Sequence, residues 1–225
     1  MNQIIKEYKG KKYLLEPVKT RILQPGDEME EIIKEYAGNL LQPGDIVSIS
    51  ESPLAITQDR AIPLSKIKPG FWARLLWRFV SKVPYGIGLR APSSMQCAIE
   101  ECGIFRILLA ALVGGIGRFV GRRGKGDFYR IAGMQAALID AAATSPVPPY
   151  ESCVIKGPSN PQGEAERISK ATGVGIAVMD INDIGGCWVI GCSYGVDKQM
   201  LESVMKSNPQ GQGAELTPLC LIRAL

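Results

Sequence analysis

Hydrophobic and polar residues alternate in short blocks along the N-terminal part of the chain. The run KYLLEPVKTRIL ends at the turn signal QPGD, and a second QPGD precedes DIVSIS, which we expect to be a strand. Between them, Met29, Ile32, Ile33 and Tyr36 recur at helical spacing and predict a helix with one buried face. Asp27 would lie at the start of that helix, where unpaired N–H groups favour an acid.

The middle of the chain, roughly residues 65–130, has a more helical pattern. The stretch KIKPGFWARLLWRFVSKV predicts an amphipathic helix whose apolar side carries Trp72, Leu75, Leu76 and Phe79. A helix facing the core is the first interpretation. A helix on a membrane surface or a partner is the alternative, because basic residues also lie together at helical spacing. The later apolar segment 107–117 is shorter than the roughly 20 residues that span a bilayer, so we expect it to be buried.

The C-terminal part predicts helices that alternate with buried strands. AERISKATG and VDKQMLESVMKSN read as helices, whereas GVGIAVMD, GGCWVIGCS and TPLCLIRAL read as strands. Such alternation indicates a sheet covered on at least one face. We therefore predict an α+β fold, with a mixed sheet flanked by helices and built from both ends of the chain. Residues 1–225 would form a single domain with a helical subdomain in the middle.

Composition adds several limits. The 225 residues are 46% hydrophobic, which suffices for a core, and the net charge of +4 does not by itself indicate nucleic acid or an anionic membrane. The N-terminus lacks an apolar signal segment, so we expect a cytoplasmic protein. The six cysteines form no CxxC pairs and are expected to be free thiols. Two C-x4-C pairs leave a four-cysteine zinc site as a minor alternative.

Histidine is absent, which excludes Ser-His-Asp triads, Cys-His pairs and histidine zinc sites. A metal would need oxygen ligands, which suits magnesium, manganese or calcium. Asp180 ends one apolar run and Asp140 follows another, while Gly211, Gln212 and Gly213 form a loop before the last strand. Together they suggest a site for nucleotide phosphates and metal, since glycines let backbone N–H groups approach phosphate. The alternatives are a turn at Asp180, a helix cap at Asp140 and a plain surface loop.

A basic loop follows the second apolar segment. In GRFVGRRGKGDFYR, Arg122, Arg123 and Lys125 lie among glycines and aromatic residues. Such a loop can bind phosphate or single-stranded RNA, and it can equally be a solvated surface loop. If the substrate is phosphorylated, we expect its anion here.

At these residues the sequence resembles the ligases that add glutamate to the deazaflavin coenzyme F420. The clearest points are GDIVSISES, ALID, GVGIAVMD and GQGAELTPLCLIR, and residues 71–129 mark a divergent branch. The resemblance implies a ligase that uses GTP or ATP with magnesium or manganese. It would activate a small-molecule carboxylate as an acyl phosphate for attack by an amino acid such as L-glutamate. It also implies a homodimer, with no DNA partner and no membrane span.

The resemblance also assigns site residues. Asp140 and Asp180 match metal ligands of the family, and the nucleotide would be bordered by Arg21, Ile22, Leu23, Glu51, Ser52, Gly211, Gln212 and Gly213. No general base is identified. The chain departs from the family at four positions, where it has Ile56 for lysine, Ala143 for asparagine, Ile181 for threonine and Gln212 for an acid.

A second hypothesis is a non-catalytic protein, descended from the ligases, that binds nucleotide or RNA through the GRRGKG loop. Metal dependence separates the two. A ligase needs Asp140 and Asp180, whereas a binding protein should tolerate their loss and fail when the arginines are replaced.

Overall fold

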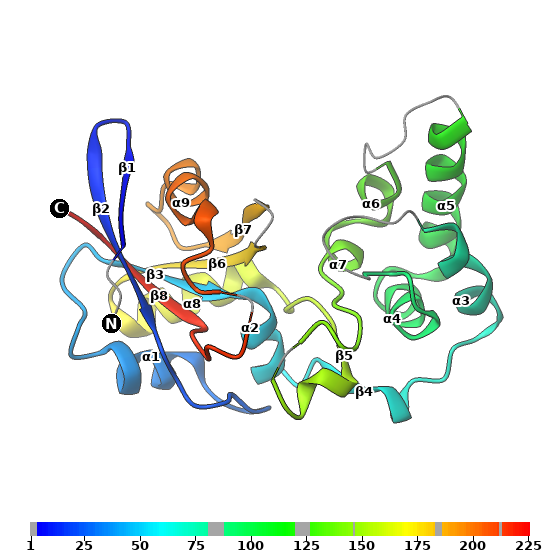
Figure 1. Cartoon of the computed structure of the whole chain (residues 1–225), viewed down its shortest axis with the longest axis horizontal. Helices are drawn as coiled ribbons and strands as arrows, with labels where there is room; N and C mark the ends of the chain where they lie inside the picture. The colour runs from blue at the N-terminus through cyan, green and yellow to red at the C-terminus, as the bar shows by residue number, and fades with distance from the viewer. Residues whose placement is uncertain (1–3, 81–87, 120–126, 146, 183–185, 212) are drawn as a thin grey trace. The chain divides into compact units, whose positions relative to one another are not determined.

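The structure of the protein is a computed structural model, and it describes residues 4–80, 88–119, 127–145, 147–182, 186–211 and 213–225. The chain forms two compact units (Figure 1). Residues 1–59 and 158–225 form what we call the sheet unit, and residues 60–157 form the helical unit inserted into it. The prediction of a single domain with a middle subdomain stays a prediction.

A mixed sheet of six strands forms the centre of the sheet unit. Its spatial order is β1-β2-β8-β3-β6-β7, and only β3 and β6 pair in parallel. This confirms the predicted α+β class and the contribution of both chain ends. The strands are β1 (Ile4–Tyr8), β2 (Lys11–Val18), β3 (Ile46–Ser50), β6 (Gly175–Ile181), β7 (Cys187–Cys192) and β8 (Leu219–Ala224).

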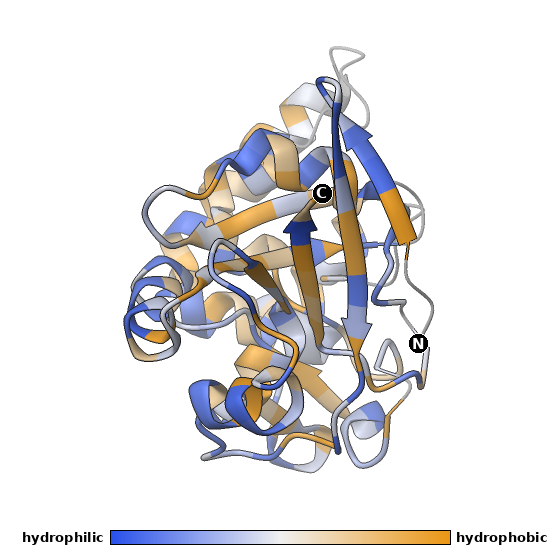
Figure 2. Ribbon diagram, turned by 90° about the vertical axis from the view of Figure 1, so that its left-hand side faces the viewer, coloured by the Kyte–Doolittle hydropathy of each residue, from blue (hydrophilic) through white to orange (hydrophobic). Residues whose placement is uncertain are grey.

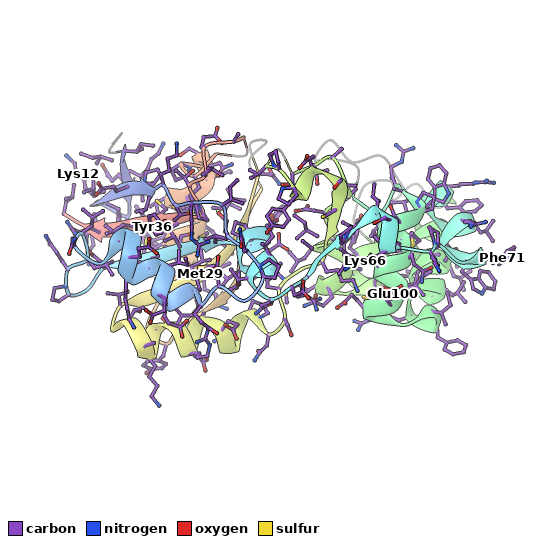
Figure 3. All side chains as sticks on the ribbon, turned by 90° about the horizontal axis from the view of Figure 1, so that it is seen from below. Lys12, Met29, Tyr36, Lys66, Phe71 and Glu100 are labelled. Atoms are coloured by element: carbon purple, nitrogen blue, oxygen red, sulfur yellow. The ribbon has the colours of Figure 1, made fainter. Side chains whose placement is uncertain are left out.

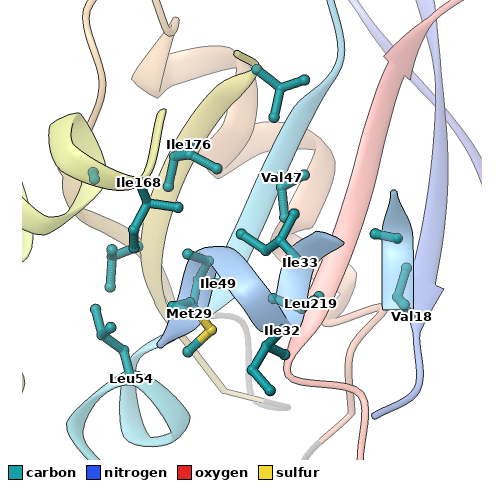
Figure 4. Packing of buried hydrophobic residues seen from close by; sticks show 14 of the residues in the cluster. Val18, Met29, Ile32, Ile33, Val47, Ile49, Leu54, Ile168, Ile176 and Leu219 are labelled. Carbon is teal, nitrogen blue, oxygen red and sulfur yellow. The ribbon is translucent and has the colours of Figure 1, made fainter. Parts of the chain in front are cut away.

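Helices cover both faces of this sheet because its strands are apolar on both sides. In β6, Ile176 and Val178 join the cluster under α1 (Met29–Ala37) and α8 (Pro161–Thr172). The alternate residues Ala177 and Met179 join the cluster under α9 (Lys198–Val204). Figure 4 shows side chains of α1 and α8 meeting those of the strands. Figure 2 shows that the central strands are hydrophobic and that the tip of the β1–β2 hairpin is hydrophilic.

The two QPGD segments fold into the same turn. In each, the glycine has a positive φ, +87° at Gly26 and +90° at Gly44. Asp27 accepts a hydrogen bond of 2.7 Å from the Gln24 N–H, and Asp45 accepts one of 2.7 Å from the Gln42 N–H. Asp27 therefore closes a turn. The expectation that it starts the helix is wrong by one residue, since the N-cap of α1 is Glu28.

Each turn aspartate is also bound by an arginine. Asp27 lies 2.6 and 2.8 Å from the two terminal nitrogens of Arg21, and these bonds hold the pKa of Asp27 below its usual value. Asp45 is buried and accepts two hydrogen bonds from Arg223, at 2.8 and 2.7 Å. The two turns thus differ in the burial of their aspartate, which is half-buried at Asp27 and buried at Asp45.

The helical unit packs its helices around Leu89, Met95, Ile107 and Val154. The antiparallel pair β4 (Ala61–Pro63) and β5 (Cys153–Ile155) lies at its two chain ends. Its α-helices are α3 (Phe71–Leu76), α4 (Pro92–Cys102), α5 (Ile104–Phe119), α6 (Asp127–Ala132) and α7 (Met134–Ala137), and short 3₁₀ turns lie at Leu64–Lys66, Trp77–Phe79 and Tyr150–Ser152. None of the helices in the described ranges is long and apolar enough to cross a bilayer.

The expected amphipathic helix over residues 65–83 is shorter and differently oriented. It comprises α3 and the following 3₁₀ turn, and the residues it buries are Ala73 and Leu76. Because the buried face follows these two positions, Trp72 and Phe79 lie outside it and are 44% and 61% exposed. The apolar side was therefore only partly predicted.

A half-buried ion cluster links α4 to the strand pair of the helical unit. Glu101 lies 2.7 Å from the Arg60 guanidinium and 3.2 Å from Lys156 Nζ. Burial alone would raise the pKa of Glu101, but hydrogen bonds from these two cations outweigh it and hold that pKa below its usual value. The Arg60 side chain also donates to the Gly157 carbonyl, and the Lys156 N–H donates to the Arg60 carbonyl at 3.0 Å.

The chain enters and leaves the helical unit side by side. Gln58, just before the entry, accepts a hydrogen bond of 2.7 Å from the N–H of Ser159, just after the exit, and donates one of 3.2 Å to the Ser159 carbonyl. The Arg60–Gly157 bond joins the same two segments two residues further into the unit. The first and last residues of the inserted helical unit are therefore adjacent.

All six cysteines are free. Burial raises the pKa of Cys97 to about 11, and it raises the pKa of Cys187 and of Cys220 to about 12. These three thiols are therefore protonated and unreactive near neutral pH. Across the described ranges, no group of three or more cysteine, aspartate or glutamate side chains is arranged to hold a metal, so nothing there supports a four-cysteine zinc site.

Candidate functional site

The carboxyl ends of three strands meet at one edge of the sheet. β3 and β6 run parallel with Ser50 opposite Met179, so Glu51 and Asp180 follow at the same edge. β2 and β3 are both antiparallel to β8, so β2 also ends at this edge. The carboxyl edge of parallel strands is the usual place for ligands in α/β sheets. We call this region the strand-end edge.

The segment that precedes β8 arrives at the same place. The Ser50 N–H donates to the Pro218 carbonyl at 2.9 Å, and the Thr20 N–H donates to the Leu216 carbonyl at 2.8 Å. The edge therefore holds the ends of β2, β3 and β6 and the segment before β8, and the predicted residues 21–23, 51–52, 180, 211 and 213 lie in or next to these segments of the chain. Figure 1 shows the ends of these strands in the sheet unit.

A buried glutamine fixes the glycine loop on β3. Gln210 is 4% exposed and accepts a hydrogen bond of 3.0 Å from the Ser48 hydroxyl. Its amide nitrogen donates to the Ser50 hydroxyl at 2.9 Å and to the Thr217 carbonyl at 3.3 Å. The Thr217 hydroxyl donates back to the Gln210 carbonyl. Gln210 was not among the predicted site residues. Two serines at alternate positions of a buried strand indicate that a polar partner is present, because buried hydroxyl groups need one.

The loop wraps around the carboxylate of Glu215. Gly211 has a φ of +74°, and a Cβ there would come within 2.9 Å of the Glu215 carboxyl carbon. A Cβ on Gly213 would come within 2.8 Å of a Glu215 carboxylate oxygen. Both positions therefore need glycine for this carboxylate to lie against the backbone. Gln212 lies outside the described residues.

A cavity of about 370 Å³ opens beside this loop. Its lining is formed by the end of β2 and by the loop: Pro17, Lys19, Asn208, Pro209, Gln210, Gly211, Glu215 and Thr217. The volume is at the small end of the range for ligand pockets. Lys19 supplies the positive charge of this lining. Nothing in the sequence pattern around Lys19 distinguished it from the other lysines of the N-terminal region.

Glu51 and Ser52 begin α2 (Glu51–Thr57), directly after β3. The Glu51 side chain is buried, and the Ser52 hydroxyl donates to one of its carboxylate oxygens at 3.2 Å. A buried carboxylate at the start of a helix benefits from the positive end of the helix dipole. This pair lies at the strand-end edge.

The three residues of the predicted Arg21–Leu23 segment have different environments. Arg21 is exposed and its guanidinium is held by Asp27 and by the Ile22 carbonyl, 3.1 Å away. Leu23 belongs to the hydrophobic core under α1, so its side chain has a structural role.

Asp180 lies inside β6, opposite Trp188 of β7, and is half-buried. The turn that follows is closed by Asn182, whose N–H donates to the Gly186 carbonyl at 2.9 Å and whose side chain accepts from the Gly186 N–H at 2.8 Å. Asp180 therefore belongs to the strand, and Asn182 rather than Asp180 closes the turn that follows. Asp183 lies outside the described residues.

Asp140 belongs to the helical unit. Its N–H donates to the Ile155 carbonyl at 2.8 Å and its carbonyl accepts from the Ile155 N–H at 3.1 Å. The helix before it, α7, ends at Ala137, so Asp140 caps no helix there. The predicted anion-binding residues Arg122, Arg123 and Lys125 lie outside the described residues.

Comparison with known proteins decides the family. The family model described as F420-0:Gamma-glutamyl ligase matches residues 17–196. The chain belongs to the F420-0:gamma-glutamyl ligase family. It is therefore a ligase that forms carbon–nitrogen bonds, and the family indicates gamma-glutamyl ligase activity in F420 biosynthesis. No curated protein matches the chain.

Three of the departures expected from the resemblance lie in described residues of this ligase. Ile56 is buried in α2, so its side chain adds no charge to the strand-end edge. Ala143 has a φ of +69°, a conformation that asparagine adopts at lower cost than alanine. Ile181 ends β6 next to Asp180 and offers a backbone carbonyl but no side-chain oxygen.

We predict that Gln210→Ala destabilises the ligase by about 1–3 kcal/mol, because it removes the partner of the buried Ser48 hydroxyl and of the half-buried Ser50 hydroxyl. The loop before β8 should also exchange its amide hydrogens faster. Urea unfolding and hydrogen exchange measure the two effects. Gln42→Ala, at an exposed glutamine, is the control and should change stability by less than about 0.5 kcal/mol. Equal stability of both variants would show that Gln210 does not anchor the loop.

Proposed function

We propose that this ligase uses GTP or ATP to join a small-molecule carboxylate to an amino acid such as L-glutamate. The observation that carries the proposal is the convergence of Glu51, Asp180 and the glycine loop at the strand-end edge. Family membership supports the same chemistry.

The reaction requires activation of the carboxylate. A substrate carboxylate oxygen attacks the terminal phosphorus of the nucleotide, and the bond to the nucleoside diphosphate breaks. The amine nitrogen then attacks the acyl carbon, the bond to phosphate oxygen breaks, and the amine proton passes to solvent. Inorganic phosphate and the amide are released. Most of the protein's contribution is positioning and charge stabilisation.

Residues at the strand-end edge suit these tasks. Lys19 on the cavity wall would bind a nucleotide phosphate as a point charge. Gln210 keeps the glycine loop in place beside Lys19, and a phosphate at Gly211 would displace the Glu215 carboxylate that lies there. In the family assignment, Arg21, Ile22, Leu23, Glu51, Ser52, Gln212 and Gly213 also border the nucleotide. The composition of the basic loop suggests that Arg122, Arg123 and Lys125 bind the anion of the substrate.

The residues present fit magnesium or manganese. Mg²⁺ is commonly bound by one or two carboxylates together with substrate phosphates and water, so a preformed cluster of three protein ligands is not required. Asp180, a half-buried carboxylate at the end of β6, would hold it. The assignment of Asp140 as a second ligand rests on the family resemblance. When bound, the metal neutralises phosphate charge. A homodimer and a cytoplasmic location belong to the same proposal.

The test is a turnover assay with GTP or ATP, manganese, L-glutamate and the carboxylate F420-0 that the family name specifies. Phosphate release that needs every component, with a product heavier by one glutamyl residue, is the expected result. Binding of nucleotide that persists after chelation of metal, without phosphate release, would contradict the ligase and favour the non-catalytic binding protein.

A further inference from the structure

The charge of the chain is divided unequally between its two units. The helical unit carries 14 lysines and arginines and 5 acidic residues, whereas the sheet unit carries 12 and 17. The net charge of +4 therefore conceals a helical unit of +9 beside a sheet unit of −5. A domain this basic attracts anionic surfaces over several ångströms of solution.

The acidic residues of the helical unit neutralise few of its surface cations. Glu100 and Glu101 are bound by Lys156 and Arg60, and Asp127 is buried. Five exposed cations have no acidic partner within the described ranges: Lys66, Lys68, Arg74, Arg78 and Arg130. Their positive charge is available to a partner.

One face of α5 exposes an apolar stripe. Phe105, Leu109, Leu112 and Ile116 are 85%, 53%, 60% and 55% exposed. Their spacing of four, three and four residues places them along a single line of the helix. The opposite side of α5 packs Ile107 and Ala110 into the core of the unit. The apolar stripe is thus a surface feature of a helix that already has its own buried face.

A second group of exposed apolar residues lies on α3 and its following turn. Phe71 and Phe79 are 72% and 61% exposed, and Arg74 and Arg78 are exposed on the same helical segment. Figure 3 shows Phe71 at the rim of the helical unit. Aromatic side chains next to arginines are typical of proteins that insert into the boundary between lipid headgroups and acyl chains.

We propose that the helical unit docks on the surface of an anionic phospholipid bilayer, through the apolar stripe of α5 and the aromatic and basic residues of α3. The apolar stripe supplies apolar area for burial and α3 supplies basic residues, and stable membrane binding requires both kinds of signal. The protein lies on the bilayer and does not cross it, consistent with its helix lengths.

Two other partners fit the α5 stripe and the α3 residues less well. A second copy of the chain would bring another unit of charge +9 against the first, which opposes association. Single-stranded nucleic acid would meet the positive charge, but Leu109, Leu112 and Ile116 offer neither hydrogen bonds nor an aromatic face for stacking. Hydrocarbon complements these aliphatic side chains.

The test is sedimentation of the full chain with vesicles of phosphatidylcholine alone or mixed with phosphatidylglycerol. We expect binding to the anionic vesicles and little to the neutral ones. Arg74→Gln with Arg78→Gln should weaken it about 25-fold, at about fivefold per basic residue. Leu109→Gln with Leu112→Gln should weaken it on the order of tenfold or more.

Matched controls come from the sheet unit. Lys11→Gln with Lys12→Gln removes two exposed charges of β2, and Ile5→Gln changes an apolar residue of β1 that is 59% exposed. Both should bind vesicles as the unchanged protein does, and thermal melting checks that all variants fold. The proposal is overturned if anionic vesicles are not bound. It is also overturned if the leucine variant binds vesicles as the unchanged protein does and an RNA oligonucleotide displaces the vesicles. A leucine variant that binds vesicles normally but no longer forms a dimer would likewise overturn it.

Discussion

Replacing Asp180 with asparagine should lower turnover of the ligase at least a hundredfold, which corresponds to about 2.7 kcal/mol in the activation barrier. Asparagine keeps the shape of the side chain and removes the negative charge proposed to hold the metal. Because Asp180 is half-buried at the end of β6, the fold should tolerate the change. The increase in melting temperature caused by nucleotide with manganese should disappear as well, since ligand that binds only the folded state stabilises it by mass action.

Glu202→Gln is a matched control for this result. Its carboxylate lies on α9 of the same unit and accepts a hydrogen bond of 3.1 Å from the Val189 N–H of β7. The change removes one negative charge outside the proposed machinery, so we expect turnover and the metal-dependent melting shift to persist. Retention of both in Asp180→Asn would show that Asp180 holds no catalytic metal.

The second large effect concerns stability. Asp45→Ala should lower the free energy of unfolding by about 3 kcal/mol, because it removes a buried carboxylate that accepts hydrogen bonds from the Arg223 guanidinium and the Gln42 N–H, leaving Arg223 with its bond to the Leu40 carbonyl. Arg223 keeps some access to water, which places the loss at the lower end of the range for broken buried pairs. Urea unfolding measures it.

The first QPGD turn supplies the comparison. Asp27 accepts the same turn hydrogen bond and the same paired contacts from an arginine, but at the surface. Solvent weakens such pairs, so Asp27→Ala should cost clearly less than Asp45→Ala. The lowered pKa of Asp27 means that its contribution is present above its ordinary value and fades as pH falls through the lowered one. Equal losses in the two variants would show that burial does not determine the strength of this turn.

The sequence predicted the sheet and its covering helices because apolar periodicity reports local burial. It also placed Glu51 and Asp180 correctly at strand ends, and strand ends share an edge whenever strands run parallel. Lys19 and Gln210 could not be found this way. Their positions depend on β8 pairing between β2 and β3, a contact between segments about 200 residues apart that no local pattern reveals.

The failure at Trp72 and Phe79 has a different cause. Periodicity identifies a face of a helix, but it does not say whether another element covers that face. In α3 the core contacts fall on Ala73 and Leu76, so the larger aromatic residues remain outside. Side-chain volume and hydrophobicity therefore misplaced Trp72 and Phe79, and the small residue Ala73 marks the closest packing.

The adjoining entry and exit of the helical unit, marked by Gln58 and Ser159, make the chain modular. Since the ends of the insertion already meet, its length adds little to the entropy of closing the loop, which grows only with the logarithm of length. The sheet with its strand-end edge can therefore keep its architecture while the inserted segment is exchanged or lengthened. Such an arrangement lets the same catalytic scaffold acquire new locations or partners without rebuilding its core.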